Sequence, residues 1–118
     1  MRDPDELGAS GRADPDLEIA LLTASFDAAE GREDALLSAL ARYVVLTRHE
    51  PACRNVDLVA SVTHARRFVV IEKWDSAVAV QAHLDSALMT EMARAALATL
   101  ARQPAIDLFD TISAHDLA

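Results

Sequence analysis

Residues 17–26 form the segment that most constrains the fold. The sequence there reads LEIALLTASF, so apolar side chains occupy both alternating positions of an extended chain. A strand with this pattern is covered on both of its faces. Residues 67–74 and 105–112 also carry apolar side chains on both parities. The sequence therefore predicts a sheet with both faces buried against other parts of the protein or against a second chain.

Helical periodicity fills the gaps between these predicted strands. From Arg32 to about His49, a stripe recurs at helical spacing, and it consists of Leu36, Ala39, Leu40, Tyr43, Val44 and Thr47. Pro51 ends this helix. Asp75-Ser76 supplies N-cap candidates for a helix through Leu84, and Asp85-Ser86 caps a further helical stretch that stops before Pro104. The stripe of that stretch consists of Met89, Met92, Ala93, Ala96, Leu97 and Leu100.

The order of these segments predicts the fold class. Residues 54–62 are strand-like and are joined to residues 67–74 by the short link 63–66, which indicates an antiparallel hairpin. The order strand, helix, strand, strand, helix, strand is the ferredoxin-like βαββαβ arrangement of the α+β class, with the helices on one face of an antiparallel sheet. Because the other face carries apolar residues such as Val69 and Ile71, we expect a homodimer packed sheet to sheet.

Charge and length limit the classes of protein to which this sequence can belong. The 118 residues carry a formal net charge of −8, and residues 1–18 supply half of it through six acids and two arginines. We expect residues 1–16 to be a disordered acidic tail and residues 17–118 to be one domain. We expect a cytoplasmic protein, because we find neither a secretory signal nor a run of roughly 18 apolar residues that would span a membrane. Without a basic patch, nucleic acid is not an expected partner.

Three stretches together resemble a known family. Residues 47–53 read TRHEPAC, residues 68–74 end in E-K-W, and His83 follows Trp74 by nine positions. This combination resembles the antibiotic biosynthesis monooxygenase domain over about residues 17–112. The resemblance implies a dimeric α/β barrel and a cofactor-independent monooxygenase that oxidises a phenolic or quinol-type aromatic with O₂. A non-catalytic ligand-binding or regulatory dimer, and an isomerase that uses the same pocket, remain open alternatives.

The candidate site combines this resemblance with residue chemistry. As an imidazole that can accept a proton at neutral pH, His83 is the predicted catalytic base. Trp74 offers a flat wall for a planar ring, and Glu72 shares its strand face. Further candidates for binding the substrate are the possible donors Tyr43, Arg54 and Asn55. Structural roles remain open for all of them: a core tryptophan, a buried histidine that ties helix to sheet, and a glutamate paired with an arginine or an amide.

The sequence predicts neither a metal site nor a bound cofactor. The four histidines, at positions 49, 64, 83 and 115, are scattered, and His49-Glu50 lacks the second histidine of a zinc-binding H-E-x-x-H motif. The three glycines open neither a dinucleotide-binding motif nor a phosphate-binding loop. Cys53 is the single cysteine, and we expect it to be a small buried apolar side chain. The expected partners are a small aromatic substrate, O₂ and a second copy of the chain.

Overall fold

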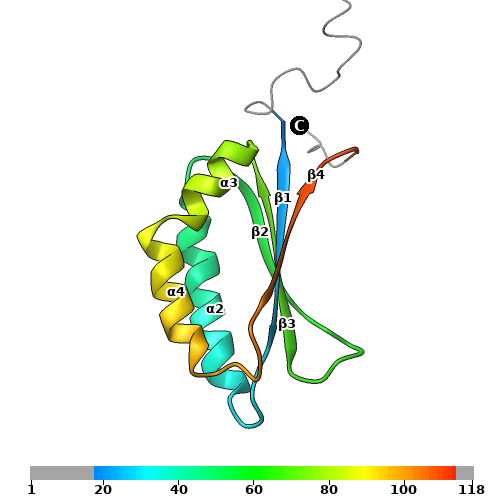
Figure 1. Cartoon of the computed structure of the whole chain (residues 1–118), viewed down its shortest axis with the longest axis vertical. Helices are drawn as coiled ribbons and strands as arrows, with labels where there is room; N and C mark the ends of the chain where they lie inside the picture. Colours follow the sequence, from blue (N-terminus) through cyan, green and yellow to red (C-terminus); the bar gives the residue numbers. More distant parts are fainter. Residues whose placement is uncertain (1–17, 114–118) are drawn as a thin grey trace, which may run out of the picture.

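The computed structural model describes residues 18–113, and the predicted tail, residues 1–16, lies outside them. The elements follow one another in this order (Figure 1): β1 (Ala20–Asp27), α2 (Glu33–Thr47), β2 (Cys53–Ala60), β3 (Arg67–Trp74), α3 (Ala77–Leu84), α4 (Ala87–Leu97) and β4 (Ala105–Asp110). Because α3 and α4 together occupy the second helical position, this is the predicted βαββαβ order. The prediction of a ferredoxin-like α+β fold is confirmed.

One antiparallel sheet joins the four strands in the order β2-β3-β1-β4. β1 and β3 pair along their whole length, from Ala20 opposite Trp74 to Asp27 opposite Arg67. β2 and β3 form the predicted hairpin, with one register shift near the start of β2. The two central strands, β1 and β3, are therefore flanked by the edge strands β2 and β4.

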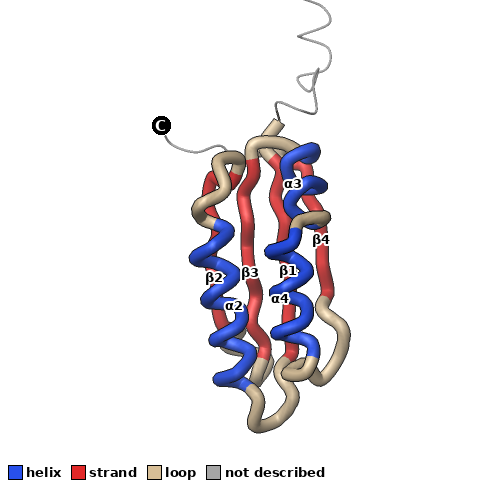
Figure 2. The backbone as a smooth tube through the Cα atoms, turned by 90° about the vertical axis from the view of Figure 1, so that its left-hand side faces the viewer, coloured by secondary structure: helices blue, strands red, loops and turns tan. Residues whose placement is uncertain are grey.

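The helices α2, α3 and α4 cover one face of this sheet (Figure 2). Ser76 and Ser86 cap α3 and α4 as predicted, because their side-chain oxygens accept hydrogen bonds from the backbone N–H groups of Ala79 at 3.1 Å and Met89 at 3.3 Å. α2 turns its predicted stripe toward the sheet, and its buried residues are Leu36, Leu40, Tyr43, Val44 and Thr47. No helix within residues 18–113 has the length and apolar character needed to cross a membrane.

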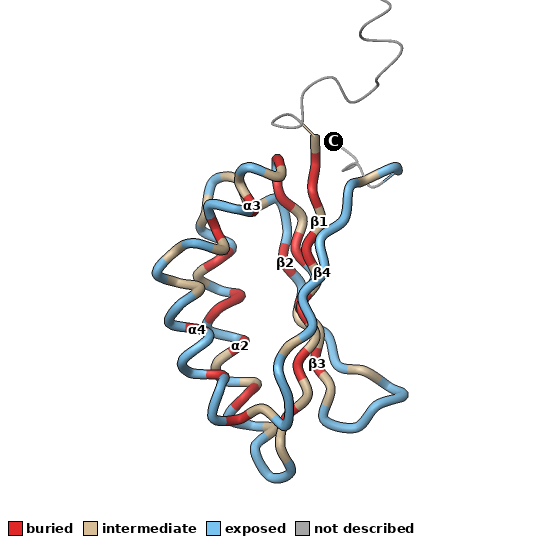
Figure 3. Tube along the Cα trace, viewed as in Figure 1, coloured by how far each residue is buried: buried red, intermediate tan, exposed pale blue. Residues whose placement is uncertain are grey.

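The core lies between the helices and the sheet, on alternating strand positions (Figure 3). In β3 the buried residues are Phe68, Val70, Glu72 and Trp74, and in β1 they are Ala20, Leu22, Ala24 and Phe26. The residues between them point to the opposite face and are more exposed. The predicted division of β3 into two faces is confirmed, and Glu72 is the one charged side chain on its buried face.

β4 and α4 differ from the sequence prediction. The predicted strand 105–112 ends at Asp110, and every residue of β4 is exposed, because this edge strand lies beyond the cover of the helices (Figure 2). The buried stripe of α4 is also narrower than predicted. Met92 and Ala96 are buried, but Leu97 is 69% exposed, because one residue turns a helix by about 100°. α4 also ends at Leu97, although its predicted stripe continues to Leu100, which instead forms an isolated bridge with Ala28. The remaining predicted boundaries differ from the observed ones by up to three residues.

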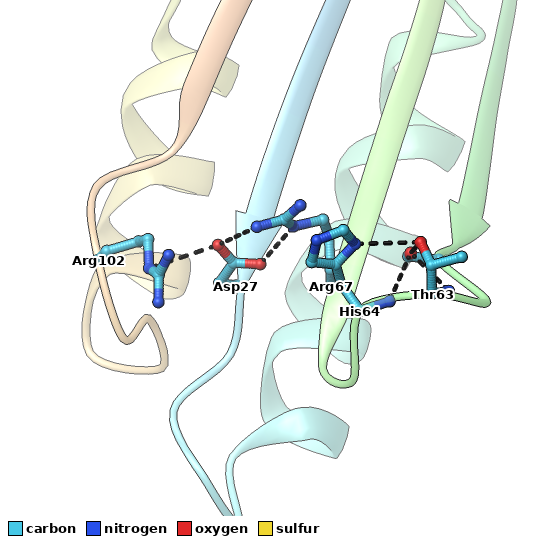
Figure 4. Close-up of polar contacts among 6 residues, drawn as sticks. Asp27, Thr63, His64, Arg67 and Arg102 are labelled. Atoms are coloured by element: carbon cyan, nitrogen blue, oxygen red, sulfur yellow. Dashed lines mark hydrogen bonds and ion pairs between the residues drawn. The ribbon is translucent and has the colours of Figure 1, made fainter.

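An ion-pair group ties the sheet together at the end remote from Trp74 (Figure 4). Arg67 Nε donates a hydrogen bond to Asp27 Oδ1 at 2.7 Å, and Arg102 Nε lies 3.4 Å from Asp27 Oδ2. The two arginines hold the pKa of Asp27 below its ordinary value, with the Arg67 hydrogen bond as the main cause. This group connects β1 and β3 with the loop that leads to β4.

Candidate active site

Five side chains from separate parts of the chain meet at the end of β3. They are Tyr43 of α2, Glu50 of the turn after α2, Glu72 and Trp74 of β3, and His83 of α3. The Tyr43 hydroxyl donates a hydrogen bond to Glu72 Oε2, and its oxygen lies 2.6 Å from His83 Nε2. At the other side of the imidazole, His83 Nδ1 lies 2.6 Å from Glu50 Oε2. We refer to these five residues as the buried cluster.

Local structure explains why four of these side chains converge. On a strand, residues two apart point to the same face, so Glu72 and Trp74 both face the helices. Tyr43 and His83 each lie three residues after a fully buried apolar residue of their own helix, and they share its buried face. As a result, Glu72 and Trp74 are 1% exposed and Tyr43 and His83 are 2% exposed.

Trp74 contacts the buried cluster through both its nitrogen and its ring. The indole N–H donates a hydrogen bond to Glu72 Oε1 at 2.9 Å. The ring centroid lies 4.5 Å from that of His83, with an angle of 37° between the planes. These contacts hold the indole within the core, whereas stacking of Trp74 on a ligand stays a prediction.

Burial controls the protonation of the buried cluster. It raises the pKa of Glu72, while hydrogen bonds from Tyr43 and Trp74 act in the opposite direction. Burial, followed by the charge of Glu72, also raises the pKa of Tyr43. Tyr43 is therefore a neutral phenol, and Glu72 holds a proton more readily than an exposed glutamate does.

Tyr43 has one hydroxyl proton for two partners, and this determines how the protons are shared. When Tyr43 donates to the Glu72 carboxylate, His83 Nε2 must donate to Tyr43. The imidazole then carries a second proton, on Nδ1, because an unprotonated Nδ1 would repel the carboxylate of Glu50. When Glu72 is protonated and donates to Tyr43, Tyr43 donates to a neutral His83 instead. Moving each proton one place along Glu72–Tyr43–His83 converts one arrangement into the other.

Glu50 is the member of the buried cluster that sequence reasoning missed as a site residue. Its contact with His83 has the separation of an ion pair but not the alignment of a hydrogen bond. The side chain of Glu50 is 31% exposed, whereas that of His83 is 1% exposed, so Glu50 links the imidazole to solvent. The available signal was the position of Glu50 in the stretch TRHEPAC, immediately before Pro51.

Arg54 and Asn55 lie outside the buried cluster. Both are exposed on β2, where Arg54 Nε donates to Asp75 Oδ1 at 2.7 Å and the Asn55 amide donates to Asp57 Oδ2 at 2.9 Å. Of the three predicted donors, the structure therefore brings only Tyr43 to His83. The physical reason is that the register shift near the start of β2 interrupts the alternation of this edge strand.

The described part of the chain offers no metal centre. Between residues 18 and 113, no three histidine, cysteine, aspartate or glutamate side chains are grouped to hold an ion. Cys53 packs against the hydrophobic core, and burial raises the pKa of its thiol to about 11. The thiol is therefore neutral at physiological pH.

Comparisons with known proteins agree with this fold. The sequence profile of the family described as antibiotic biosynthesis monooxygenase matches residues 19–95. The chain is similar to PA3566 of Pseudomonas aeruginosa, with 26% identity, a TM-score of 0.72, and 81% of this chain and 96% of that chain covered. It is also similar to Rv0793 of Mycobacterium tuberculosis, with 22% identity, a TM-score of 0.77, and 83% and 99% covered.

A third solved structure is that of an antibiotic biosynthesis monooxygenase, with 24% identity, a TM-score of 0.72, and 79% of this chain and 98% of that chain covered. No curated protein matches the chain. The match over residues 19–95 spans more than half of the sequence and includes every member of the buried cluster. The chain therefore belongs to the antibiotic biosynthesis monooxygenase family.

Proposed function

We propose that the protein is a monooxygenase that oxidises a phenolic or quinol-type aromatic with O₂ and without a bound cofactor. The observation that carries the proposal is the row of close contacts Glu50–His83–Tyr43, in which one imidazole has a carboxylate at one nitrogen and a phenol hydroxyl at the other. Membership of the family supports the reaction type.

Oxygenation without a cofactor begins with loss of a proton, because a phenolate gives an electron to O₂ more readily than a phenol does. With an anthrone-type substrate, a CH₂ group becomes a carbonyl: one oxygen atom enters the product and the other leaves as water. The substrate supplies all four electrons that O₂ accepts. The protein must therefore accept a proton and surround the resulting anion with hydrogen-bond donors.

We assign the proton-accepting role to His83 in the arrangement in which Glu72 holds a proton and the imidazole is neutral. The Glu50 carboxylate, 2.6 Å away, stabilises the imidazolium as it forms, because opposite charges attract strongly where water is excluded. Glu50 is also the partly exposed member of the buried cluster, so the proton has a path to solvent. Tyr43, held neutral by burial, is the donor nearest to the imidazole.

Substrate access requires a movement of the protein. Trp74 and His83 are 1% and 2% exposed, so a planar molecule reaches them only when the chain opens beside them. The element best placed to move is α3, because it is a helix of eight residues and carries His83, whose ring centroid lies 4.5 Å from that of Trp74. We expect substrate to enter between α3 and the sheet and to lie against Trp74.

Apolar side chains that the helices leave exposed on the sheet support a homodimer. Ile71 and Phe109 lie on the outer face and are 36% and 44% exposed. On the helix side, Ile106 and Leu108 of β4 are 50% and 51% exposed. A second copy packed against the outer face and β4 would cover these apolar side chains, and an obligate interface of this kind buries about 2,000 Å² or more. Cytoplasmic residence stays a prediction from the sequence.

Oxygen uptake by the purified, metal-free full chain tests the proposed reaction, with a panel of quinols and anthrone-like phenols as substrates. His83→Ala should lower turnover far more than it weakens substrate binding, whereas Trp74→Ala should weaken binding, because stacking acts on substrate and transition state alike. His83→Gln serves as the better-packed variant, and circular dichroism checks that each variant folds.

Three outcomes separate the candidate functions. Uptake that depends on His83 supports the oxygenase. Rearrangement of a substrate without oxygen consumption contradicts it and supports the isomerase. Binding of aromatics by a folded protein that shows no turnover and no oxygen uptake contradicts it in favour of the ligand-binding dimer.

A further inference from the structure

A pocket lies between α2 and α4, away from the contact of His83 with Glu50. It has a volume of about 430 Å³, within the range of roughly 300–1,000 Å³ that small-molecule sites occupy. Its apolar wall includes Tyr43, Leu88 and Met92, and its polar residues are Arg42, Glu91 and Arg94. The pocket therefore has an apolar interior large enough for two or three fused rings, and charged groups beside it.

The two arginines are the feature that points to a ligand. Arg42 on α2 and Arg94 on α4 are exposed, and neither forms an ion pair or a side-chain hydrogen bond within the part of the chain that the structure describes. Two guanidinium groups from different helices thus face one pocket in a chain whose formal net charge is −8. Glu91 offsets one of them, which leaves the pocket with a net positive charge.

We propose that this pocket binds an anionic aromatic small molecule, whose carboxylate or sulfonate pairs with Arg42 and Arg94 and whose rings lie on Leu88 and Met92. Guanidinium groups recognise such anions through paired N–H donors, and their flat faces also pack on rings. The proposal goes beyond phenol oxidation at His83, since it requires neither O₂ nor a base.

Tyr43 connects this pocket to the buried cluster. Tyr43 is one of the residues that line the pocket, and its hydroxyl contacts both Glu72 and His83. A ligand in the pocket would therefore lie beside the residue whose hydroxyl contacts the imidazole. The pocket is thus in a position to bind a regulator of the site or the anionic part of a longer substrate.

Isothermal titration calorimetry with 1-naphthoate tests the proposal, with the neutral 1-naphthamide as the matched probe. We expect naphthoate to bind more tightly than the amide, and added salt to remove the difference. Arg42→Gln and Arg94→Gln should each weaken naphthoate binding by about three-fold, the size typical of an exposed ion pair. Glu91→Gln should strengthen it, because it removes the opposing charge.

Matched variants separate the pocket from general surface effects. Ala95→Phe places a ring in the pocket and should abolish naphthoate binding, whereas Ala93→Phe, also exposed on α4 but not part of the pocket wall, should leave it unchanged. Arg32→Gln, an exposed arginine at the start of α2, should likewise have no effect. Equal affinities for naphthoate and naphthamide, unaltered binding in both arginine variants, or no binding at 1 mM would overturn the proposal.

His83→Ala distinguishes this proposal from the proposed reaction. If both are correct, this variant loses oxygen uptake but still binds naphthoate. A wild-type protein that binds naphthoate and oxidises none of the substrates contradicts the reaction alone. Oxidation without charge-dependent binding of naphthoate contradicts the pocket alone.

Discussion

The Nε2 atom of His83 lies 2.6 Å from the hydroxyl oxygen of Tyr43. The two residues are 40 positions apart in the sequence and belong to different helices, α3 and α2. Because Tyr43 also donates to Glu72, its single hydroxyl connects a helix to the sheet through buried polar atoms. Buried polar groups without a partner are costly, so this contact fixes α3 relative to β3 as well as orienting the imidazole.

Tyr43→Phe should destabilise the protein by roughly 1–3 kcal/mol, because both Glu72 and His83 lose a buried partner while the packing of the ring is kept. Urea unfolding measures the change in the free energy of unfolding. As the control, the double variant Tyr43→Phe with Glu72→Leu should cost less than the sum of the two single changes, because each change alone removes one partner of the same hydrogen bond and leaves the other buried without it. Additive effects would show that the two side chains are not coupled.

Glu50→Gln should lower kcat by roughly ten-fold or more with little change in KM, because the charge opposite His83 acts when the imidazolium forms. Steady-state oxygen uptake with the best substrate of the panel measures both constants. Glu30→Gln, an exposed change outside the buried cluster, is the matched control and should leave both constants unaltered. A rise in KM alone would show instead that Glu50 contributes to substrate binding.

Glu72 should make the protein less stable as the pH rises. Its folded-state pKa is raised by burial, so the stabilisation is present below the unfolded pKa, near 4.5, and is lost as the pH rises through the folded value. Glu72→Gln has a side chain that stays neutral. Its free energy of unfolding should therefore increase relative to that of the wild type as the pH rises through the folded-state pKa of Glu72. Denaturation midpoints of both proteins across the pH range measure the difference. A difference that is constant with pH would contradict the shift.

Asp27 should act in the opposite direction. Its folded-state pKa is lowered, chiefly by the Arg67 hydrogen bond, so its stabilisation is present above the unfolded pKa of about 3.8 and is lost as the pH falls through the folded value. Asp27→Asn should lower the free energy of unfolding at neutral pH. The variant should also lose less of that free energy than the wild type does as the pH falls. Asp57→Asn, an exposed aspartate on β2, is the control. Identical acid-unfolding curves for wild type and Asp27→Asn would refute the assignment.

Ile71→Asp should convert the protein from a dimer to a monomer at micromolar concentration, because it places a charge in the middle of the proposed interface. Analytical ultracentrifugation of the wild type and the variant measures the oligomeric state. Val45→Asp is matched to it, since Val45 is 53% exposed but lies on α2, and it should leave the dimer intact. A monomeric wild type would rule out the dimer directly.

Short-range patterns in the sequence were sufficient to predict the fold. The strand 67–74 has the boundaries that its alternation predicts, and both serine caps form where the sequence places them. These features depend on residues two to four positions apart, whose geometry is set by the strand or the helix itself. The same local periodicity placed Tyr43 on the apolar stripe of its helix and Glu72 and Trp74 on one strand face, and all three are buried. His83 was identified by the family resemblance and its imidazole chemistry, and its burial is a finding of the structure.

Only the tertiary structure decided which of those residues touch. The contacts of His83 with Tyr43 and Glu50 depend on how α2, α3 and the turn before Pro51 pack over the sheet, and local periodicity contains no information on that packing. The same holds for what the helices leave uncovered. An apolar strand predicts burial, but β4 lies at the sheet edge beyond their reach, so its side chains are exposed in a single chain. Burial depends on what packs against a residue, and that is set by contacts between elements far apart in the sequence.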